Sequence, residues 1–270
     1  MRKTVILLLM CAFSCSLLAC SNKTKQDGQI NDMQNSTGNE DMKIENTIPS
    51  DIYPTTKGDL KVTLVGHGSL MFEFGGKVIH VDPYSKVADY EKLPKADLIL
   101  ITHEHADHLD SQAINAVKKD NTRFIVSEIC NQQLGYGEVM KNGDVEQFDG
   151  IAITAVPAYN IVNKRPDGVF YHPKGRGNGY VLVFGDKQVY VGGDTENIPE
   201  MNNLKGKIEI AFLPKNLPYT MTDDMFVDAA KKVSPKYVYP YHFAEFDEKA
   251  IGDKLNGSGI KILVRPMSNK

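Results

Sequence analysis

Cysteine is scarce in this chain of 270 residues, and the few cysteines are unevenly placed. Cys11, Cys15 and Cys20 lie within the first 20 residues, and only Cys130 follows. A disulfide within the region after residue 20 is therefore excluded. Excess positive charge is also lacking, because the formal net charge is -3. The sequence thus offers no broad basic field for nucleic acid, and we expect no nucleic-acid partner.

Long apolar runs are lacking except at the start of the chain. Arg2 and Lys3 precede an apolar stretch that ends in Leu-Leu-Ala-Cys at residues 17–20. The stretch is too short for a membrane span and is typical of a secretory signal, residues 1–20. Its ending resembles the bacterial lipoprotein processing box, which implies a lipid on Cys20. We therefore expect export and a lipid anchor in a bacterial membrane, at the cell surface or the periplasmic face; an ordinary signal peptide cut nearby is the alternative.

The region that follows the signal is polar. Residues 21–57 are rich in Asn, Asp, Lys, Gln, Ser, Thr and Gly and have few large apolar side chains. Such a segment buries too little surface to offset the entropy lost on ordering. We expect a flexible tether at 21–57 and one folded domain at 58–270, which is long enough to bury its own core.

The domain reads as short apolar strands separated by Gly, Pro and Asp. Helices are predicted at Asp110–Lys119 and Thr222–Val233, both of which begin with capping residues, and more weakly at Phe246–Leu255. Met71–Pro83 and Val181–Asp194 both read as tight hairpins that run to an acid just past the second strand. These paired hairpins predict two half-sheets of similar build. The fold class is therefore α/β (α+β), with a sandwich of two sheets.

The segment ITHEHADHLD, residues 101–110, carries three of the seven histidines directly after a buried strand predicted at Leu98–Ile101. His103 and His105 are two residues apart, so in an extended segment they point the same way. Asp107 and His108 follow where the chain turns. Neutral imidazole and carboxylate groups are ligands that zinc prefers. A hydrophilic loop that holds histidines by chance is a poor alternative for this spacing.

This motif resembles the signature of the metallo-β-lactamase superfamily. The segments GHGS (Gly66–Ser69) and VDPY (Val81–Tyr84), with VPAYN, HPKG, GGDT and YPYH, look like the branch of ascorbate-6-phosphate lactonase and N-acyl-phosphatidylethanolamine phospholipase D. The resemblance implies a four-layer αββα sandwich with metal held at one edge by loops of both sheets. It also implies two metal sites: the first with His103 and His105, the second with Asp107, His108 and His242, and Asp194 bridging both.

The sequence departs from the family pattern at one position. The family supplies a third histidine to the first metal after the strand that ends in Val156-Pro157-Ala158, and here Asn160 stands there. An amide oxygen is a weaker zinc ligand than imidazole. Three alternatives follow: Asn160 is a poor ligand, His172 enters from the HPKG loop, or the first site binds metal weakly.

Other polar residues receive open interpretations. His67 either contacts substrate and ligands or is a structural turn histidine, and Asp82 is expected to accept a proton from a ligating imidazole. The segment HPKGRGNG, with His172 and Lys174, is either a mobile loop that clamps an anionic substrate or a long turn. Lys215 either polarises a carbonyl or phosphate in catalysis or lies on the surface.

These residues predict a metal-dependent hydrolase in which one or two Zn²⁺ ions, or Mn²⁺ or Fe, activate water. Asp107 would orient the resulting hydroxide and move a proton to the leaving group. We expect a small-molecule substrate, an ester, lactone or phosphodiester rather than a β-lactam. No GxSxG-like nucleophile motif is present. The alternatives are a non-catalytic surface lipoprotein that binds metal or ligand, and a nuclease of the same superfamily, which export and acidic charge disfavour.

Overall fold

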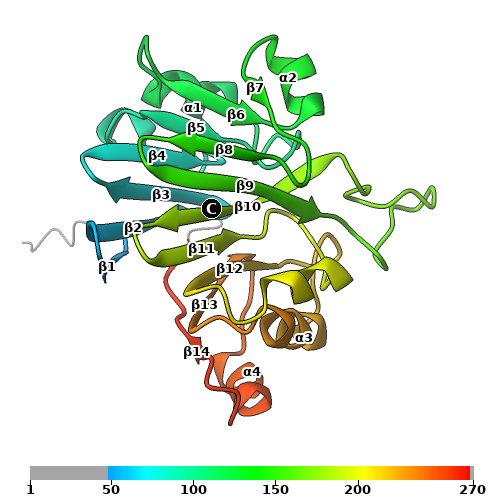
Figure 1. Cartoon of the computed structure of the whole chain (residues 1–270). Helices are drawn as coiled ribbons and strands as arrows, with labels where there is room; N and C mark the ends of the chain where they lie inside the picture. Colours follow the sequence, from blue (N-terminus) through cyan, green and yellow to red (C-terminus); the bar gives the residue numbers. More distant parts are fainter. Residues whose placement is uncertain (1–47, 268–270) are drawn as a thin grey trace, which may run out of the picture. The chain divides into compact units, whose positions relative to one another are not determined.

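The structure, a computed structural model, describes residues 48–267, which form two β-sheets packed face to face (Figure 1). The predicted signal peptide and most of the predicted tether lie outside the described residues. The first sheet contains, in spatial order, β1 (Ser50–Thr55), β2 (Gly58–Gly66), β3 (Ser69–Phe74), β4 (Lys77–Val81), β5 (Leu98–Leu100), β6 (Arg123–Val126) and β7 (Glu138–Val139). The second contains β8 (Val145–Phe148), β9 (Ile151–Ala158), β10 (Gly177–Phe184), β11 (Lys187–Val191), β12 (Ile210–Lys215), β13 (Tyr237–Phe243) and β14 (Lys261–Ile262), also in spatial order.

The two sheets have the same connectivity, as the paired hairpins predict. In each sheet the first four strands pair antiparallel and the remaining strands pair parallel. The β3–β4 and β10–β11 hairpins occupy corresponding places. Parallel strands that follow one another need crossover connections, and these bring the loops after several strands to a common edge.

Helices cover the outer face of each sheet. The side of the first sheet packs against α1 (Ser111–Val117), α2 (Glu128–Leu134) and the 3-10 turn η1 (Tyr90–Lys92). The side of the second sheet packs against α3 (Asp223–Val233), α4 (Glu248–Leu255) and the 3-10 turn η2 (Pro199–Leu204). The order helix, sheet, sheet, helix confirms the predicted four-layer sandwich.

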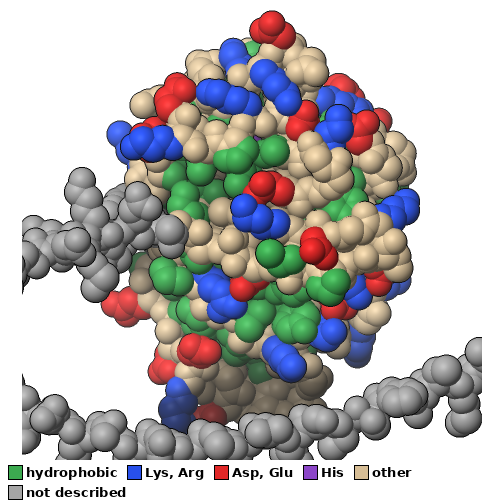
Figure 2. Space-filling view, turned by 90° about the vertical axis from the view of Figure 1, so that its left-hand side faces the viewer, with side chains coloured by type: hydrophobic (Ala, Val, Ile, Leu, Met, Phe, Trp, Pro, Cys, Tyr) green, Lys and Arg blue, Asp and Glu red, His purple; other side chains and the backbone are tan. Residues whose placement is uncertain are grey.

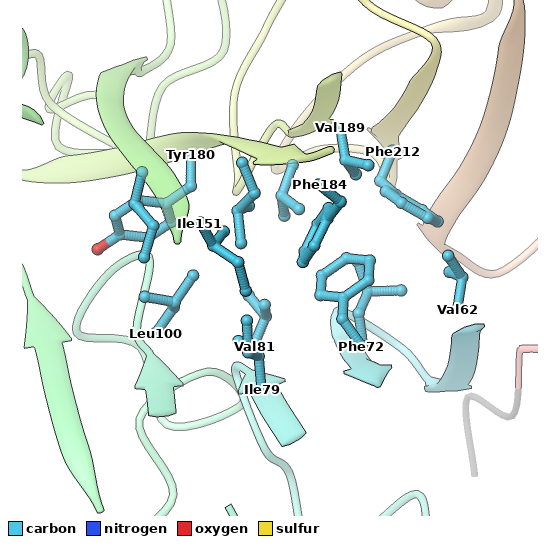
Figure 3. Close-up of a cluster of buried hydrophobic side chains, with 14 of the residues drawn as sticks. Val62, Phe72, Ile79, Val81, Leu100, Ile151, Tyr180, Phe184, Val189 and Phe212 are labelled. Atoms are coloured by element: carbon cyan, nitrogen blue, oxygen red, sulfur yellow. The ribbon is translucent and has the colours of Figure 1, made fainter. Parts of the chain in front are cut away.

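The space between the sheets is filled by apolar side chains from both (Figure 3). Phe72 of the first sheet packs against Phe184 and Phe212 of the second, with ring centroids 5.6 and 6.1 Å apart. All three rings are fully buried. Burial of a side chain of this size contributes about 1.5–3 kcal/mol, so the sheets hold together through their core without a disulfide.

The predicted helices are present, with shorter bounds. Asp110 caps α1 by accepting from the backbone N–H of Gln112, and Thr222 caps α3 in the same way from Met225. The capping residues therefore lie just outside the helices that they start. Helix α2 and strands β7 and β8 were not predicted, because each is short and carries little apolar periodicity.

The predicted tether boundary at residue 57 is wrong, because β1 begins at Ser50. Strand β1 pairs antiparallel with β2 along its whole length. Asp51 also forms an ion pair with Arg265, with 2.9 Å between Oδ1 and Nη2, and Tyr53 packs against the core. The polar composition of this strand reflects its place at a sheet edge, where one side faces solvent.

Cys130, in α2, is buried and unpaired. Ser127, the N-cap of the helix, donates its hydroxyl to the Cys130 sulfur at 3.2 Å. Burial raises the pKa of the Cys130 thiol to about 12. The side chain therefore acts as a small apolar group rather than as a reactive thiolate.

The outer surface mixes charges of both signs. Figure 2 shows the face at the left of Figure 1, where lysine, arginine, aspartate and glutamate side chains alternate with hydrophobic ones. Neither sign of charge dominates this face. Among the described residues, no helix is both long and apolar enough to cross a membrane.

His80 in β4 generates a prediction about stability and pH. Its side chain is fully buried, and its Nε2 donates to the carbonyl of Pro94 at 2.9 Å. Burial lowers its pKa from 6.5 to about 4. Below pH 6.5 the unfolded chain takes up this proton first, so we expect stability to fall as pH drops from about 6.5 to about 4, by up to about 3 kcal/mol from this residue.

The substitution His80→Gln tests this expectation, because Gln keeps an N–H for Pro94 and does not titrate. Urea unfolding of both proteins between pH 7 and pH 4.5 measures the free energy of unfolding. The stability of the variant should depend less on pH than that of the wild type. Equal pH dependence in the two proteins would contradict the assignment.

Candidate metal centre

The polar residues singled out in the sequence meet at one edge of the sandwich. Asp82 follows β4, residues 102–110 follow β5, and Asp194 follows β11. His242 lies near the end of β13, and the segment 159–176 joins β9 to β10. The edge where these strands end thus gathers side chains separated by more than 100 residues.

A first group of nitrogen atoms comes from three histidines, His103, His105 and His172. His105 Nδ1 lies 3.1 Å from His103 Nε2 and 3.2 Å from His172 Nε2. His172 Nε2 is also 3.2 Å from Asp194 Oδ2. Three imidazoles and a carboxylate at this spacing match a tetrahedral zinc donor set.

A second group brings together four residues, His67, Asp107, His108 and His242. His242 Nε2 lies 3.4 Å from Asp107 Oδ2 and 3.6 Å from Asp194 Oδ2. His108 Nε2 lies 3.5 Å from Asp194 Oδ1 and 3.8 Å from Asp107 Oδ2. Asp194 therefore faces both groups, which is the bridging position that the resemblance implies.

Unsatisfied polar atoms show that these residues fit a metal ion. His108 Nε2, His242 Nε2 and Asp194 Oδ1 are buried and have no hydrogen-bond partner within residues 48–267. All three belong to side chains no more than 5% exposed. Buried polar atoms without partners are rare in proteins, and a shared cation would satisfy all three at once.

Asp82 orients the ligand His108 through the ring nitrogen that faces away from the metal group. Its Oδ2 accepts from Nδ1 of His108 at 2.8 Å and from the Thr102 hydroxyl at 2.5 Å. Its Oδ1 accepts from the Thr102 backbone N–H at 2.7 Å. The first contact fixes the tautomer that leaves His108 Nε2 free to bind metal. The predicted supporting role of Asp82 is consistent with this geometry.

The charges of the acids act on His108. Burial alone would lower its pKa, but the carboxylates of Asp194 and Asp82 raise it to about 10. Burial alone would raise the pKa of Asp107, but the imidazoles of His242 and His67 beside its carboxylate hold it below its usual range. The acids at the centre are therefore ionised and attract positive charge, in the form of protons or metal.

The backbone is strained at the centre. His67, Asp82 and His242 have φ angles of 51°, 47° and 50°. Residues other than glycine rarely adopt this left-handed conformation. Each residue held in it destabilises the fold by of order 1–3 kcal/mol. Strain of this kind is typical of sites where side-chain placement matters more than local stability.

Gly68 makes room for two ligands. A Cβ atom at this residue would lie 2.7 Å from Cε1 of His108 and 3.4 Å from Cδ2 of His242. The first distance is shorter than contacts between real atoms, and the imidazole of His108 is held by Asp82. A larger residue at position 68 would therefore displace a predicted ligand.

Asn160 is not a ligand, and this prediction is wrong. Its Oδ1 accepts from both the backbone N–H and Nδ1 of His172, each at 2.7 Å, and its Nδ2 donates to Glu196 and to the Tyr219 carbonyl. His172 takes the third histidine position, which was one of the alternatives. The amide oxygen of Asn160 instead fixes the tautomer that turns His172 Nε2 towards the metal group.

Two predicted cations lie away from the centre. Lys215, predicted as catalytic, forms an ion pair with Asp223 at 2.8 Å and donates to the Glu245 carbonyl. Lys174 forms an ion pair with Glu200 at 2.7 Å and lies over the Tyr159 ring. The residues Gly177–Gly179 of the proposed substrate loop belong to β10. These cations are held by neighbouring acids and do not face the metal groups.

His67 lies at the centre, as one of its two interpretations requires. Its Nε2 is 2.8 Å from Asp107 Oδ2, and its ring lies 3.8 Å from that of His242. With these residues it lines a cavity of about 490 Å³. The cavity is lined by His67, His105, Asp107, Arg165, Tyr171, His172, Asp194, Asn216, Tyr219 and His242.

The sequence analysis singled out neither Glu196 nor Arg165, which also lie at this edge. Buried Glu196 accepts from the backbone N–H groups of Ile161, Val162 and Asn163 at 2.6–2.7 Å and so fixes the loop that leads to His172. Its place two residues after Asp194 was a usable signal. Arg165, which lines the cavity, gave none, because it stands in an irregular loop.

The comparisons with known proteins agree with this site. A family model described as a beta-lactamase superfamily domain matches residues 61–242. The chain belongs to the metallo-β-lactamase superfamily. A "UPF0173 metal-dependent hydrolase" of Flavobacterium johnsoniae is 32% identical over 200 residues, which cover 69% of this chain and 86% of that relative.

Solved structures show the same relationship. A structure from Parabacteroides distasonis, described as that of a metal-dependent hydrolase, is 47% identical, with a TM-score of 0.77; the match covers 82% of this chain and all of the other. Igni18, a metallo hydrolase of Ignicoccus hospitalis, is 25% identical, with a TM-score of 0.63 and coverage of 78% and 96%.

The family and fold predictions are confirmed, and the chain is a metal-dependent hydrolase of this superfamily with a His/Asp cluster able to bind metal. Its finer placement near the lactonase and phospholipase D enzymes stays a prediction. The lipoprotein signal also stays a prediction.

Gly68 offers a test of the metal centre in which no predicted ligand is itself substituted. We expect Gly68→Ala to displace His108 and to weaken metal binding about 10–100-fold, the loss typical when support of a ligand is disturbed. Competition with a chromogenic chelator measures this affinity. Gly252→Ala is the matched control, because nothing lies within 4 Å of its Cβ position in α4. Unchanged affinity in Gly68→Ala would contradict the assignment of His108 as a ligand.

Proposed function

We propose that this enzyme hydrolyses a small ester, lactone or phosphodiester with one or two zinc ions. The observation that carries the proposal is the cavity of about 490 Å³, whose lining includes members of both donor groups and Asp194. A cavity of this size suits a small molecule. Imidazole and carboxylate donors favour zinc, while Mn²⁺ and Fe remain compatible with the same atoms.

A divalent ion in this site would supply Lewis acidity, which lowers the pKa of water and polarises a carbonyl or phosphoryl oxygen. The chain itself supplies Asp107, which lines the cavity as an ionised carboxylate. Asp107 would orient the attacking water and move its proton to the leaving group. His67, at 2.8 Å, would hold the Asp107 carboxylate in place.

A non-catalytic protein that binds metal or ligand is the alternative. The cavity argues against it, because a structural metal site is closed, whereas a catalytic site keeps an open position. His105, Asp107 and Asp194 all border open space. A nuclease is disfavoured, since the net charge is -3 and the chain therefore offers no excess of positive charge to nucleic acid.

The double substitution His105→Ala with Asp194→Ala tests the hydrolase proposal. We expect loss of bound metal, measured by elemental analysis, and loss of turnover of at least 1,000-fold against lactones, phosphodiesters and esters, because removal of the metal removes its activated water. Lys254→Ala, which removes a surface ion pair with Asp224, is the control and should keep both the bound metal and the turnover. Full turnover without metal would reject the proposal.

We also propose that the protein is exported and held at a bacterial membrane by a lipid on Cys20. The supporting observations are the apolar segment that ends in Leu-Leu-Ala-Cys and the polar residues that follow it. A tethered domain would act on small molecules at the outer side of that membrane.

The substitution Cys20→Ser tests the anchor, because serine cannot accept the thioether-linked lipid. In cell fractionation, the variant should be found in the soluble fraction or as unprocessed precursor, whereas the wild type should be found with the membrane. Mass spectrometry of the wild type should show an acylated N-terminal cysteine. Wild-type protein that starts at another residue without lipid would favour an ordinary signal peptide.

A further inference from the structure

A small hairpin stands over the cavity, in the segment that projects between β9 and β10 in Figure 1. Lys164 and Phe170 form an isolated antiparallel bridge, and the Arg165 N–H donates to the Val169 carbonyl at 2.7 Å. Glu196 fixes the chain just before the hairpin through three backbone N–H groups. The hairpin therefore holds the backbone of Arg165 at the mouth of the cavity.

Arg165 differs from the other arginines of the described region. Arg123, Arg176 and Arg265 each form an ion pair with a carboxylate. No carboxylate within residues 48–267 lies within 4.0 Å of the Arg165 guanidinium. Its Nη2 instead lies 3.3 Å from Nε2 of His105 and 3.4 Å from the carbonyl of Tyr171. This positive charge lines the cavity without a negative partner.

The contact with His105 becomes unfavourable once the first metal group is filled. Nδ1 is the His105 atom that faces His103 and His172, so Nδ1 is the metal-binding atom. A neutral imidazole that binds metal through Nδ1 carries its proton on Nε2. Two donors, His105 Nε2–H and the guanidinium of Arg165, then face each other, and an anionic oxygen between them would satisfy both.

We propose that Arg165, together with Nε2–H of His105, binds one anionic group of the substrate, a carboxylate or a phosphate. This inference rests on the proposed hydrolase function, whose substrate class it narrows. Arginine suits the role because its planar guanidinium matches carboxylate and phosphate geometry.

The surroundings limit the ligand to a small molecule with little negative charge. The other cations of the segment are engaged: Lys164 lies over the Phe170 ring, Lys174 pairs with Glu200, and Arg176 pairs with Glu104. A polyphosphate or a nucleic acid would find one free cation here. Exposed apolar side chains lie on this segment and on the loop between β12 and α3, and they suit an apolar remainder of the substrate: Ile161, Val162, Val169, Leu217 and Tyr219.

Binding of matched probes to the zinc-loaded protein tests the proposal without any need for turnover. Isothermal titration calorimetry would compare 4-phenylbutyrate and phenyl phosphate with neutral 4-phenylbutyramide. We expect Arg165→Ala to lower the affinity for both anions at least tenfold and to leave the affinity for the amide unchanged. The anion that the wild type binds more tightly then shows whether the site prefers a carboxylate or a phosphate group.

Two further variants make the result specific to the guanidinium. Lys164→Ala removes a cation from the same hairpin and should leave anion binding unchanged, while Arg165→Lys should retain part of it. Zinc content and thermal unfolding, measured for each variant, should match the wild type, since Arg165 is exposed.

The proposal is overturned if Arg165→Ala binds the anions as the wild type does, if Lys164→Ala loses as much affinity, or if the wild type does not prefer the anions to the amide. The outcome is separate from that of the hydrolase proposal. Loss of anion binding in Arg165→Ala, with no turnover of any ester by the wild type, would keep the anion site and reject hydrolysis. Ester turnover by the wild type, with no change of anion affinity in Arg165→Ala, would keep the hydrolase proposal and reject the anion site.

Discussion

The metal edge depends on one buried carboxylate, that of Asp194. Its two oxygens lie within 4 Å of ligand nitrogens of His103, His108, His172 and His242. The first two histidines follow a strand of the first sheet, and the other two belong to the second sheet and its loops. An ionised carboxylate 5% exposed is costly unless positive charge lies beside it. The arrangement is therefore stable only when cations, as protons or as metal, hold the loops of both sheets together.

Behind this carboxylate, further acids and amides set the orientation of each imidazole. Asp82 turns His108, and Asn160 turns His172, in each case through a hydrogen bond to the ring nitrogen that faces away from the metal group. Glu196 fixes the loop that delivers His172. These supporting residues hold the ligands in place without binding metal themselves. Left-handed φ angles occur both at the supporting residue Asp82 and at His67 and His242 of the second group.

The sequence predicted the features that depend on local pattern. The spacing of His103, His105 and His108 after an apolar strand identified the centre, because strand alternation and a sharp turn bring such residues together. The two similar hairpins predicted two sheets of similar build. Asp82 was expected to support a ligating imidazole, and its hydrogen bond to His108 Nδ1 is consistent with that role.

The sequence-based predictions fail at residues whose role is set by contacts with residues far away in the chain. The sequence left open whether Asn160 or His172 completes the first group, because the path of their loop is set by Glu196, more than 20 residues away. Lys215 and Lys174 read as free cations, but Asp223 and Glu200 pair with them in space. Strand β1 was read as tether because its partner β2 and Arg265, rather than its own composition, give it order.

The lone thiol of the described domain has a consequence for where such a fold can work. Cys130 is fully buried within a helix, and burial raises the pKa of its thiol, which disfavours the thiolate that exchange with glutathione or oxidation requires. The residues 48–267 consequently hold no disulfide of their own in either reducing or oxidising surroundings. The same apolar core would therefore form under either redox condition.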